Sequence, residues 1–171
     1  MHAKSKIALA VGALVAPVVA LSVPGIASAN EYISNPPSRQ AQCAAGTVGC
    51  DSVQGEQLSV EGPKGLTDCS GGNERFAELN DDSKEWKATP VGRMQQFAWK
   101  VSAPHKTSSF QYFVGGRRIA EFTEAGKEVG IETVTHTLDF GNLTGKQKVL
   151  AVWNIEDTAN ALYSCIDVNV K

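Results

Sequence analysis

Histidines are the side chains in this sequence with the clearest chemical potential, and three are present. Imidazole nitrogens exchange protons near neutral pH and bind transition metals. His105 follows Pro104 and keeps the alternating parity of Trp99, which predicts a position where a strand ends and a loop begins. A histidine there can point into solvent and serve a site. The alternative is an ordinary surface histidine.

The other two histidines are weaker candidates. His136 lies in an alternating run on the same face as Val134 and Leu138, which predicts a hydrogen-bonded histidine in the core. His2 lies in an N-terminal segment that we expect to be removed. With one candidate histidine left, the sequence offers no Ser-His-Asp arrangement that could be defended.

Carboxylates are the second possible source of chemistry. Glu61, Glu156 and Asp157 could pair as the acid and base of a glycoside hydrolase, but the sequence sets no distance between them. Structural alternatives exist for each position. Glu61 could cap a loop, and Asp157 and Asn160 could fix a turn before the last strand, because Asp and Asn readily bond backbone groups.

The first 29 residues have the pattern of a secretory signal peptide. Lys4 and Lys6 precede an apolar segment from Ile7 to Val23, and Ala27-Ser28-Ala29 supplies the small residues of a cleavage site. A membrane helix is the alternative, but the apolar segment is short, and no other stretch is apolar for long enough to cross a bilayer.

Cleavage after residue 29 leaves a mature domain, 30–171, that begins at Asn30 and is expected to be secreted and extracellular. Its 142 residues fit one domain with its own core. Loss of two lysines moves the formal net charge from −2 to −4, which argues against nucleic acid as the main partner. We expect no membrane partner and a monomer.

Four cysteines lie in the mature segment, and an exported chain favours two disulfides. Three pairings are possible. Cys43 and Cys50 are close enough in sequence to close a short loop, which would leave Cys69 to pair with Cys165. A zinc site is the weaker alternative because no C-x-x-C pair is present.

The fold class follows from a change in pattern along the mature segment. The segment up to about residue 75 is rich in Gly, Pro and Ser and poor in periodicity, which predicts loops with short helical turns. Short strand-like runs follow, separated by turn signals, which predicts an all-β sandwich. The predicted strands are 96–103, 109–114, 133–140, 148–155 and 162–170.

Five blocks of residues stand in order along nearly all of the mature segment. They are Tyr32-Ile33-Ser34-x-Pro-x-Ser38-Arg39-x-x-x-Cys43, Cys50-x-Ser52-Val53-Gln54 with Ser59-Val60-Glu61-Gly62-x-Lys64-Gly65, Trp99-Lys100-x-x-Ala103-Pro104-His105, Leu150-Ala151-Val152-Trp153-x-Ile155-x-Asp157-Thr158-x-Asn160-Ala161, and Ile166-Asp167-Val168-Asn169. Together they resemble the bacterial lytic polysaccharide monooxygenases, also called chitin-binding type-4 domains. The resemblance implies an immunoglobulin-like or fibronectin-III-like sandwich with a flat polar face for crystalline polysaccharide. It also agrees with the pairs Cys43–Cys50 and Cys69–Cys165.

The resemblance further implies a copper site, the histidine brace. The mature N-terminal histidine of such a site binds copper through its α-amine and its ring, and a second histidine, here His105, completes it. Imidazole and amine nitrogens suit copper, which heads the divalent affinity order. The remaining positions carried over are Glu61 near the copper face, Ser102 and Ala103 beside His105, and Asp157 and Asn160 on or next to that face.

This sequence departs from the family pattern at three positions. Asn30 stands where the brace histidine belongs, and an amide is a poor copper ligand beside imidazole. Leu162 stands where the family usually has an aromatic ring beside the copper axis. Gly55 stands where chitin-active members often present an aromatic to the substrate.

Two functions from different classes remain, and they leave open whether the chain is an enzyme. The first is a secreted protein that binds chitin, or cellulose, through a face near Glu56, Glu61, His105, Asp157 and Asn160, with weak or absent copper binding. The second is a copper monooxygenase with a weakened site, in which the Asn30 α-amine and His105 hold the metal with a water or a backbone nitrogen.

Overall fold

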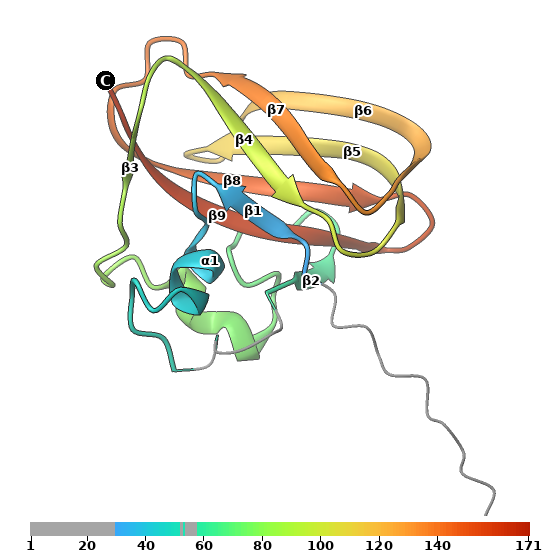
Figure 1. Cartoon of the computed structure of the whole chain (residues 1–171), viewed down its shortest axis with the longest axis horizontal. Helices are drawn as coiled ribbons and strands as arrows, with labels where there is room; N and C mark the ends of the chain where they lie inside the picture. Colours follow the sequence, from blue (N-terminus) through green and yellow to red (C-terminus); the bar gives the residue numbers. More distant parts are fainter. Residues whose placement is uncertain (1–29, 52, 54–57) are drawn as a thin grey trace, which may run out of the picture.

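Two β-sheets packed face to face make up most of the computed structural model, which describes residues 30–51, 53 and 58–171 (Figure 1). The smaller sheet has the strand order β1 (Tyr32–Asn35), β4 (Met94–Lys100) and β7 (Thr133–Asp139). The larger sheet has the order β2 (Val60–Pro63), β9 (Asn160–Val170), β8 (Gly145–Ile155), β5 (His105–Val114) and β6 (Arg117–Val129), and β3 (Thr89–Val91) runs parallel to β9. These two sheets confirm the predicted all-β sandwich.

The loop-rich early segment lies against the larger sheet. It carries the short helix α1 (Arg39–Ala44) and the 3₁₀ helix η1 (Glu74–Asn80). Neither these nor any other helix in the described ranges has the length and apolarity to cross a membrane. The predicted signal segment 1–29 lies outside the described residues.

All five predicted strands are present, but their bounds differ. β4 ends at Lys100 rather than at residue 103. His105 is therefore the first residue of β5, and not the residue at which β4 passes into a loop. The long strand β6 was not predicted. It has a register shift opposite Thr107 and Ser109, where Ala125 and Gly126 have φ of 50° and 81°. Its inward positions are only half-buried and include Glu124 and Gly126, so the apolar period-2 signal on which the prediction depended is weak.

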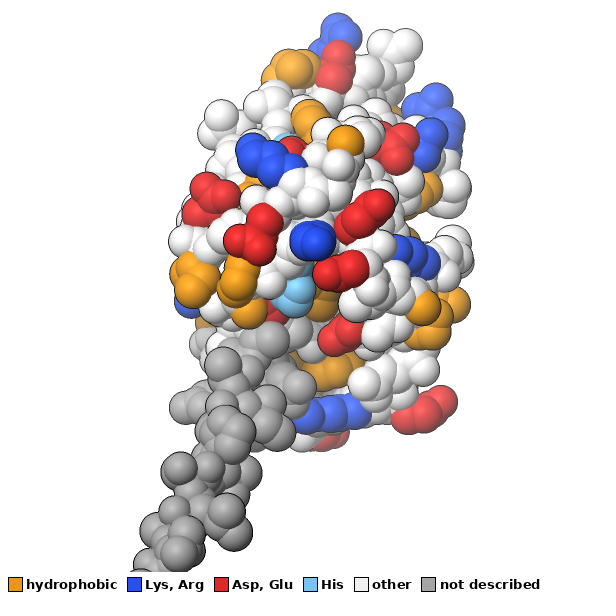
Figure 2. Space-filling model, turned by 90° about the vertical axis from the view of Figure 1, so that its right-hand side faces the viewer, with side chains coloured by type: hydrophobic (Ala, Val, Ile, Leu, Met, Phe, Trp, Pro, Cys, Tyr) orange, Lys and Arg blue, Asp and Glu red, His pale blue; other side chains and the backbone are white. Residues whose placement is uncertain are grey.

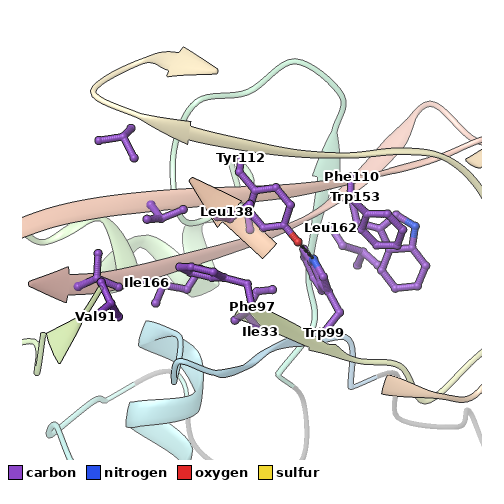
Figure 3. Close-up of a cluster of buried hydrophobic side chains, with 14 of the residues drawn as sticks. Ile33, Val91, Phe97, Trp99, Phe110, Tyr112, Leu138, Trp153, Leu162 and Ile166 are labelled. Carbon is purple, nitrogen blue, oxygen red and sulfur yellow. Dashed lines mark hydrogen bonds between the residues drawn. The ribbon is translucent and has the colours of Figure 1, made fainter. Parts of the chain in front are cut away.

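Aromatic side chains fill the space between the sheets (Figure 3). Trp99 of β4 and Trp153 of β8 meet edge to face, with ring centroids 5.7 Å apart. Their indole nitrogens are satisfied, since Trp99 donates to Tyr112 Oη (3.1 Å) and Trp153 donates to Thr107 Oγ1 (2.9 Å). The predicted alternation of β4 therefore places its aromatic side chains in the core, as expected.

Two disulfides hold the loop-rich segment. Cys43 bonds Cys50 across seven residues, and Cys69 bonds Cys165 of β9 across 96 residues. The second bond joins the early loops to a central strand of the larger sheet. Both belong to a second core cluster beneath these loops, together with Tyr163.

We expect the two disulfides to contribute unequally to stability. In the chain-entropy account, a bond that closes a longer loop restricts the unfolded chain more, so loss of Cys69–Cys165 should cost about 5 kcal/mol and loss of Cys43–Cys50 about 2 kcal/mol. Urea unfolding of the double variants Cys69→Ala/Cys165→Ala and Cys43→Ala/Cys50→Ala measures both costs. Equal losses, or a larger loss for the short loop, would contradict this prediction.

Candidate functional site

Three connections between strands meet at one end of the sandwich, together with Asn30 and β2. They are 101–104, 130–132 and 156–159. Backbone hydrogen bonds hold them: Val101 N donates to Glu132 O (3.0 Å), and Glu156 N donates to Lys106 O (2.7 Å). This end lies on the right of Figure 1 and faces the viewer in Figure 2, where acidic side chains gather on it.

His105 carries a buried, unpartnered polar atom at this end. It pairs with Val129 of β6, and its ring stands edge-on to Trp153 with centroids 5.3 Å apart. The side chain is half-buried, and Nε2 is buried without a hydrogen-bond partner among the described residues. An unsatisfied buried nitrogen is costly, so Nε2 is available to a metal, a water or a substrate hydroxyl.

Asn30 lies beside the connection 101–104, which leads to His105, and is held by both its main chain and its side chain. Its main-chain nitrogen donates to Ser102 Oγ at 2.7 Å, and its side-chain Oδ1 accepts from Leu58 N at 3.1 Å. The amide side chain is therefore engaged with the backbone next to β2. The structure places Asn30, Ser102 and His105 at the same end.

Glu61 and Asn160 form a second polar pair at this end. Asn160 Nδ2 donates to Glu61 Oε1 at 2.7 Å, and the two residues lie on the paired strands β9 and β2. Glu61 is exposed, and its carboxylate pairs with the side chain of Asn160 instead of capping a loop. Asp157 is exposed in the adjacent connection 156–159. The predicted polar residues Glu61, Asp157 and Asn160 thus share this end with His105.

The remaining predicted positions differ in outcome. Glu56 and Gly55 lie outside the described residues. Leu162 pairs with Glu61 in the sheet, but its side chain is buried, 3 % exposed, in the core between the sheets. Leu162 therefore presents no group to a ligand at the surface.

Glu31 is the residue that sequence reasoning missed. Its side chain is fully buried and accepts hydrogen bonds from Ser102 and Ala103. Its parity with Ile33, which is also fully buried, is the signal that could have placed it inside.

His136 is a core residue and no part of this end, as predicted. It is 7 % exposed, and its Nδ1 lies 2.7 Å from Tyr112 Oη. Its ring stacks on Phe122 with centroids 4.1 Å apart. Burial accordingly lowers its pKa from 6.5 to about 4.

The described residues fit a copper brace only in part. The unpartnered Nε2 of His105 fits one imidazole ligand. Asn30 supplies no second imidazole, and its amide oxygen already accepts a hydrogen bond. No group of three or more His, Cys, Asp or Glu side chains in the described part of the chain could hold a metal ion. Among the described residues, this end therefore offers one imidazole, that of His105.

Comparisons with known proteins agree with this architecture. The family model described as lytic polysaccharide mono-oxygenase, cellulose-degrading, matches residues 32–168. A lytic chitin monooxygenase of Streptomyces ambofaciens is 62 % identical over 171 residues, 99 % of each chain. GlcNAc-binding protein A of Shewanella oneidensis is 30 % identical over 84 % of this chain, which spans 36 % of that protein's length. A solved lytic polysaccharide monooxygenase of Jonesia denitrificans is 43 % identical with a TM-score of 0.76, covering 83 % of this chain and all of that one.

The low pKa of His136 predicts how stability depends on pH. Because the unfolded chain takes up a proton near pH 6.5 and the folded chain only near pH 4, stability should fall as the pH drops through this window. The loss at pH 4 should reach about 3 kcal/mol. Urea unfolding of wild type and His136→Gln at pH 7 and pH 4 isolates this loss, because the variant has no imidazole at this position. The same pH-dependent loss in both proteins would contradict the prediction.

Proposed function

We propose that this chain, which belongs to the lytic polysaccharide monooxygenase family, is a secreted polysaccharide-binding protein whose copper site is impaired. The observation that carries the proposal is the position of Asn30 and the hydrogen bond of its side chain. Asn30 occupies the position that the family resemblance gives to a copper-binding histidine, and its side chain is bonded to Leu58 N. An end that retains its polar residues but lacks one imidazole suits binding better than redox chemistry.

Copper is the cofactor on which this family depends, and when bound it supplies the centre that activates oxygen or peroxide. In this chain, His105 Nε2 and the main-chain nitrogen of Asn30 are the groups left to hold it. After cleavage at residue 29 that nitrogen would be an α-amine. Two nitrogen donors bind copper less tightly than three, so we expect weak or absent binding.

Chitin is the proposed polysaccharide. The Streptomyces ambofaciens relative is named a lytic chitin monooxygenase, and the Shewanella oneidensis relative a GlcNAc-binding protein. The pair Glu61–Asn160, with Ser102 and Asp157 at the same end, offers donors and acceptors for hydroxyl and N-acetyl groups. Glu56 is proposed as a further contact. Cellulose is the alternative substrate, because the family model is described as cellulose-degrading.

The cellular setting belongs to the same proposal. Residues 1–29 act as a signal peptide, and the domain 30–171 works outside the cell as a monomer. Insoluble polysaccharide is its partner, with no nucleic acid or membrane involved.

A copper-dependent monooxygenase is the second candidate. The buried, unpartnered Nε2 of His105 favours it, because a metal would satisfy that atom. The 62 % identity to a lytic chitin monooxygenase favours it as well. Glu61 would then lie beside the metal ligands and influence the reaction without binding the metal.

Copper titration of the mature protein separates the two candidates. We expect wild type to bind copper(II) weakly and the Asn30→His variant to bind at least ~100-fold more tightly, because the variant restores an imidazole ligand. Isothermal calorimetry on both proteins measures the difference, and His105→Ala in the Asn30→His background serves as the control. Tight one-to-one binding by wild type would favour the enzyme instead.

Chitin binding tests the polar face directly. Asn160→Ala removes the Asn160–Glu61 hydrogen bond and the proposed sugar contact, so affinity for crystalline chitin should fall roughly fivefold, the equivalent of about 1 kcal/mol. Asn142→Ala is the control, because Asn142 is an exposed asparagine that lies between β7 and β8 at the opposite end. Depletion isotherms measure both affinities, and equal losses would count against the assigned face.

A further inference from the structure

Glu31 is a buried carboxylate held by hydrogen bonds alone. The side chain is 0 % exposed, and it joins no ion pair among the described residues. Removing a carboxylate from water is costly unless other groups replace its hydration. A residue buried at such a cost must be well compensated by its contacts.

Four donors replace that hydration. Oε1 accepts from Ser102 N (3.2 Å), Ser102 Oγ (2.8 Å) and Ala103 N (2.9 Å). Oε2 accepts from Ser59 Oγ at 2.7 Å. Hydrogen bonds to a carboxylate are stronger than those between neutral groups. The carboxylate is therefore fixed from two sides by residues far away in sequence.

These bonds join three segments at this end. Sheet pairing already places Tyr32 opposite Lys100, so the start of β1 lies beside the end of β4. The Glu31 carboxylate adds direct bonds to the residues after β4 and to the segment before β2. Glu31 directly precedes β1, Ser59 directly precedes β2, and Ser102 and Ala103 lie in the connection that leads to His105. Asn30 is included, because Ser102 Oγ accepts from Asn30 N while it donates to Glu31 Oε1. The N-terminal residue is thus linked to the His105 connection through Ser102.

We propose that Glu31 is a positioning residue, an internal clasp that fixes Asn30 and the connection 101–104 so that His105 and Ser102 are presented to polysaccharide without a metal ion. In a histidine brace, a metal would join the N-terminal residue to the second histidine. In this chain, hydrogen bonds centred on one carboxylate join the same two segments. This inference rests on the proposed binding function.

Two measurements on protein secreted from the full-length chain test the clasp. The first is amide hydrogen exchange at Ser102 and Ala103, whose N–H groups donate to Glu31. The second is the affinity for crystalline chitin. The variants are Glu31→Ala, which removes the acceptor, and Glu31→Gln, which keeps its shape and one carbonyl oxygen. Val170→Ala is the control, because Val170 is a core residue at the opposite end of β9.

We expect exchange at Ser102 and Ala103 to accelerate at least ~10-fold in Glu31→Ala, with chitin affinity at least ~5-fold weaker. Glu31→Gln should lie between Glu31→Ala and wild type in both measurements. Val170→Ala should lower the melting temperature while leaving both measurements near wild type. In wild type, neither copper nor a chelator should change the exchange rates.

Three results would overturn the clasp. The first is a Glu31→Ala variant whose amide exchange rates and chitin affinity equal those of wild type. The second is an equal loss of affinity in Val170→Ala, which would indicate general destabilisation. The third is exchange in wild type that slows when copper is added, which would indicate a metal link.

The test still gives an answer if a variant does not fold or if wild type does not bind chitin. If Glu31→Ala does not fold, Glu31→Gln and Ser59→Ala decide the question, because each weakens the clasp while removing little volume. If wild type does not bind chitin, the proposed function fails, while the exchange rates at Ser102 and Ala103 still decide the clasp.

Discussion

The contact between Trp99 and Trp153 is the interaction on which the candidate site depends. The two indoles come from opposite sheets, and their edge-to-face contact at 5.7 Å sets the separation of the sheets near the end that carries the site. The ring of His105 stands edge-on to the same Trp153, so the core supports the imidazole from one side. Side chains on a rigid, buried support can present fixed hydrogen-bonding groups to a flat substrate.

Around that support lie the polar residues of this end. The amide of Asn30 is turned to the backbone at Leu58. The next residue, Glu31, fills the interior with a carboxylate that accepts four hydrogen bonds. The polar pair Glu61–Asn160 remains at the surface. A polar surface pair near one histidine imidazole is consistent with the proposed binding function.

Alternating side chains made much of the fold predictable, since β4 and β7 each bury one face against the core. β6 gave a weak apolar signal because its inward positions are only half-buried, and the end of β4 at Lys100 moved His105 to the start of β5. For the site, His105, Asn160 and Glu61 could be named from family-like blocks of residues. Glu31 could not be named in this way, because its role depends on Ser59 and Ser102, which only the folded chain brings to it. Its parity with Ile33 could have placed the side chain inside, but parity does not identify the donors that meet it.

The most direct test of the central claim is the chitin-binding isotherm of chelator-treated protein, measured with and without one equivalent of copper(II). If hydrogen-bonding groups held by the protein form the binding face, the two dissociation constants should agree within about twofold. A copper-dependent gain of tenfold or more would contradict the account, because the metal would then be a working part of the face.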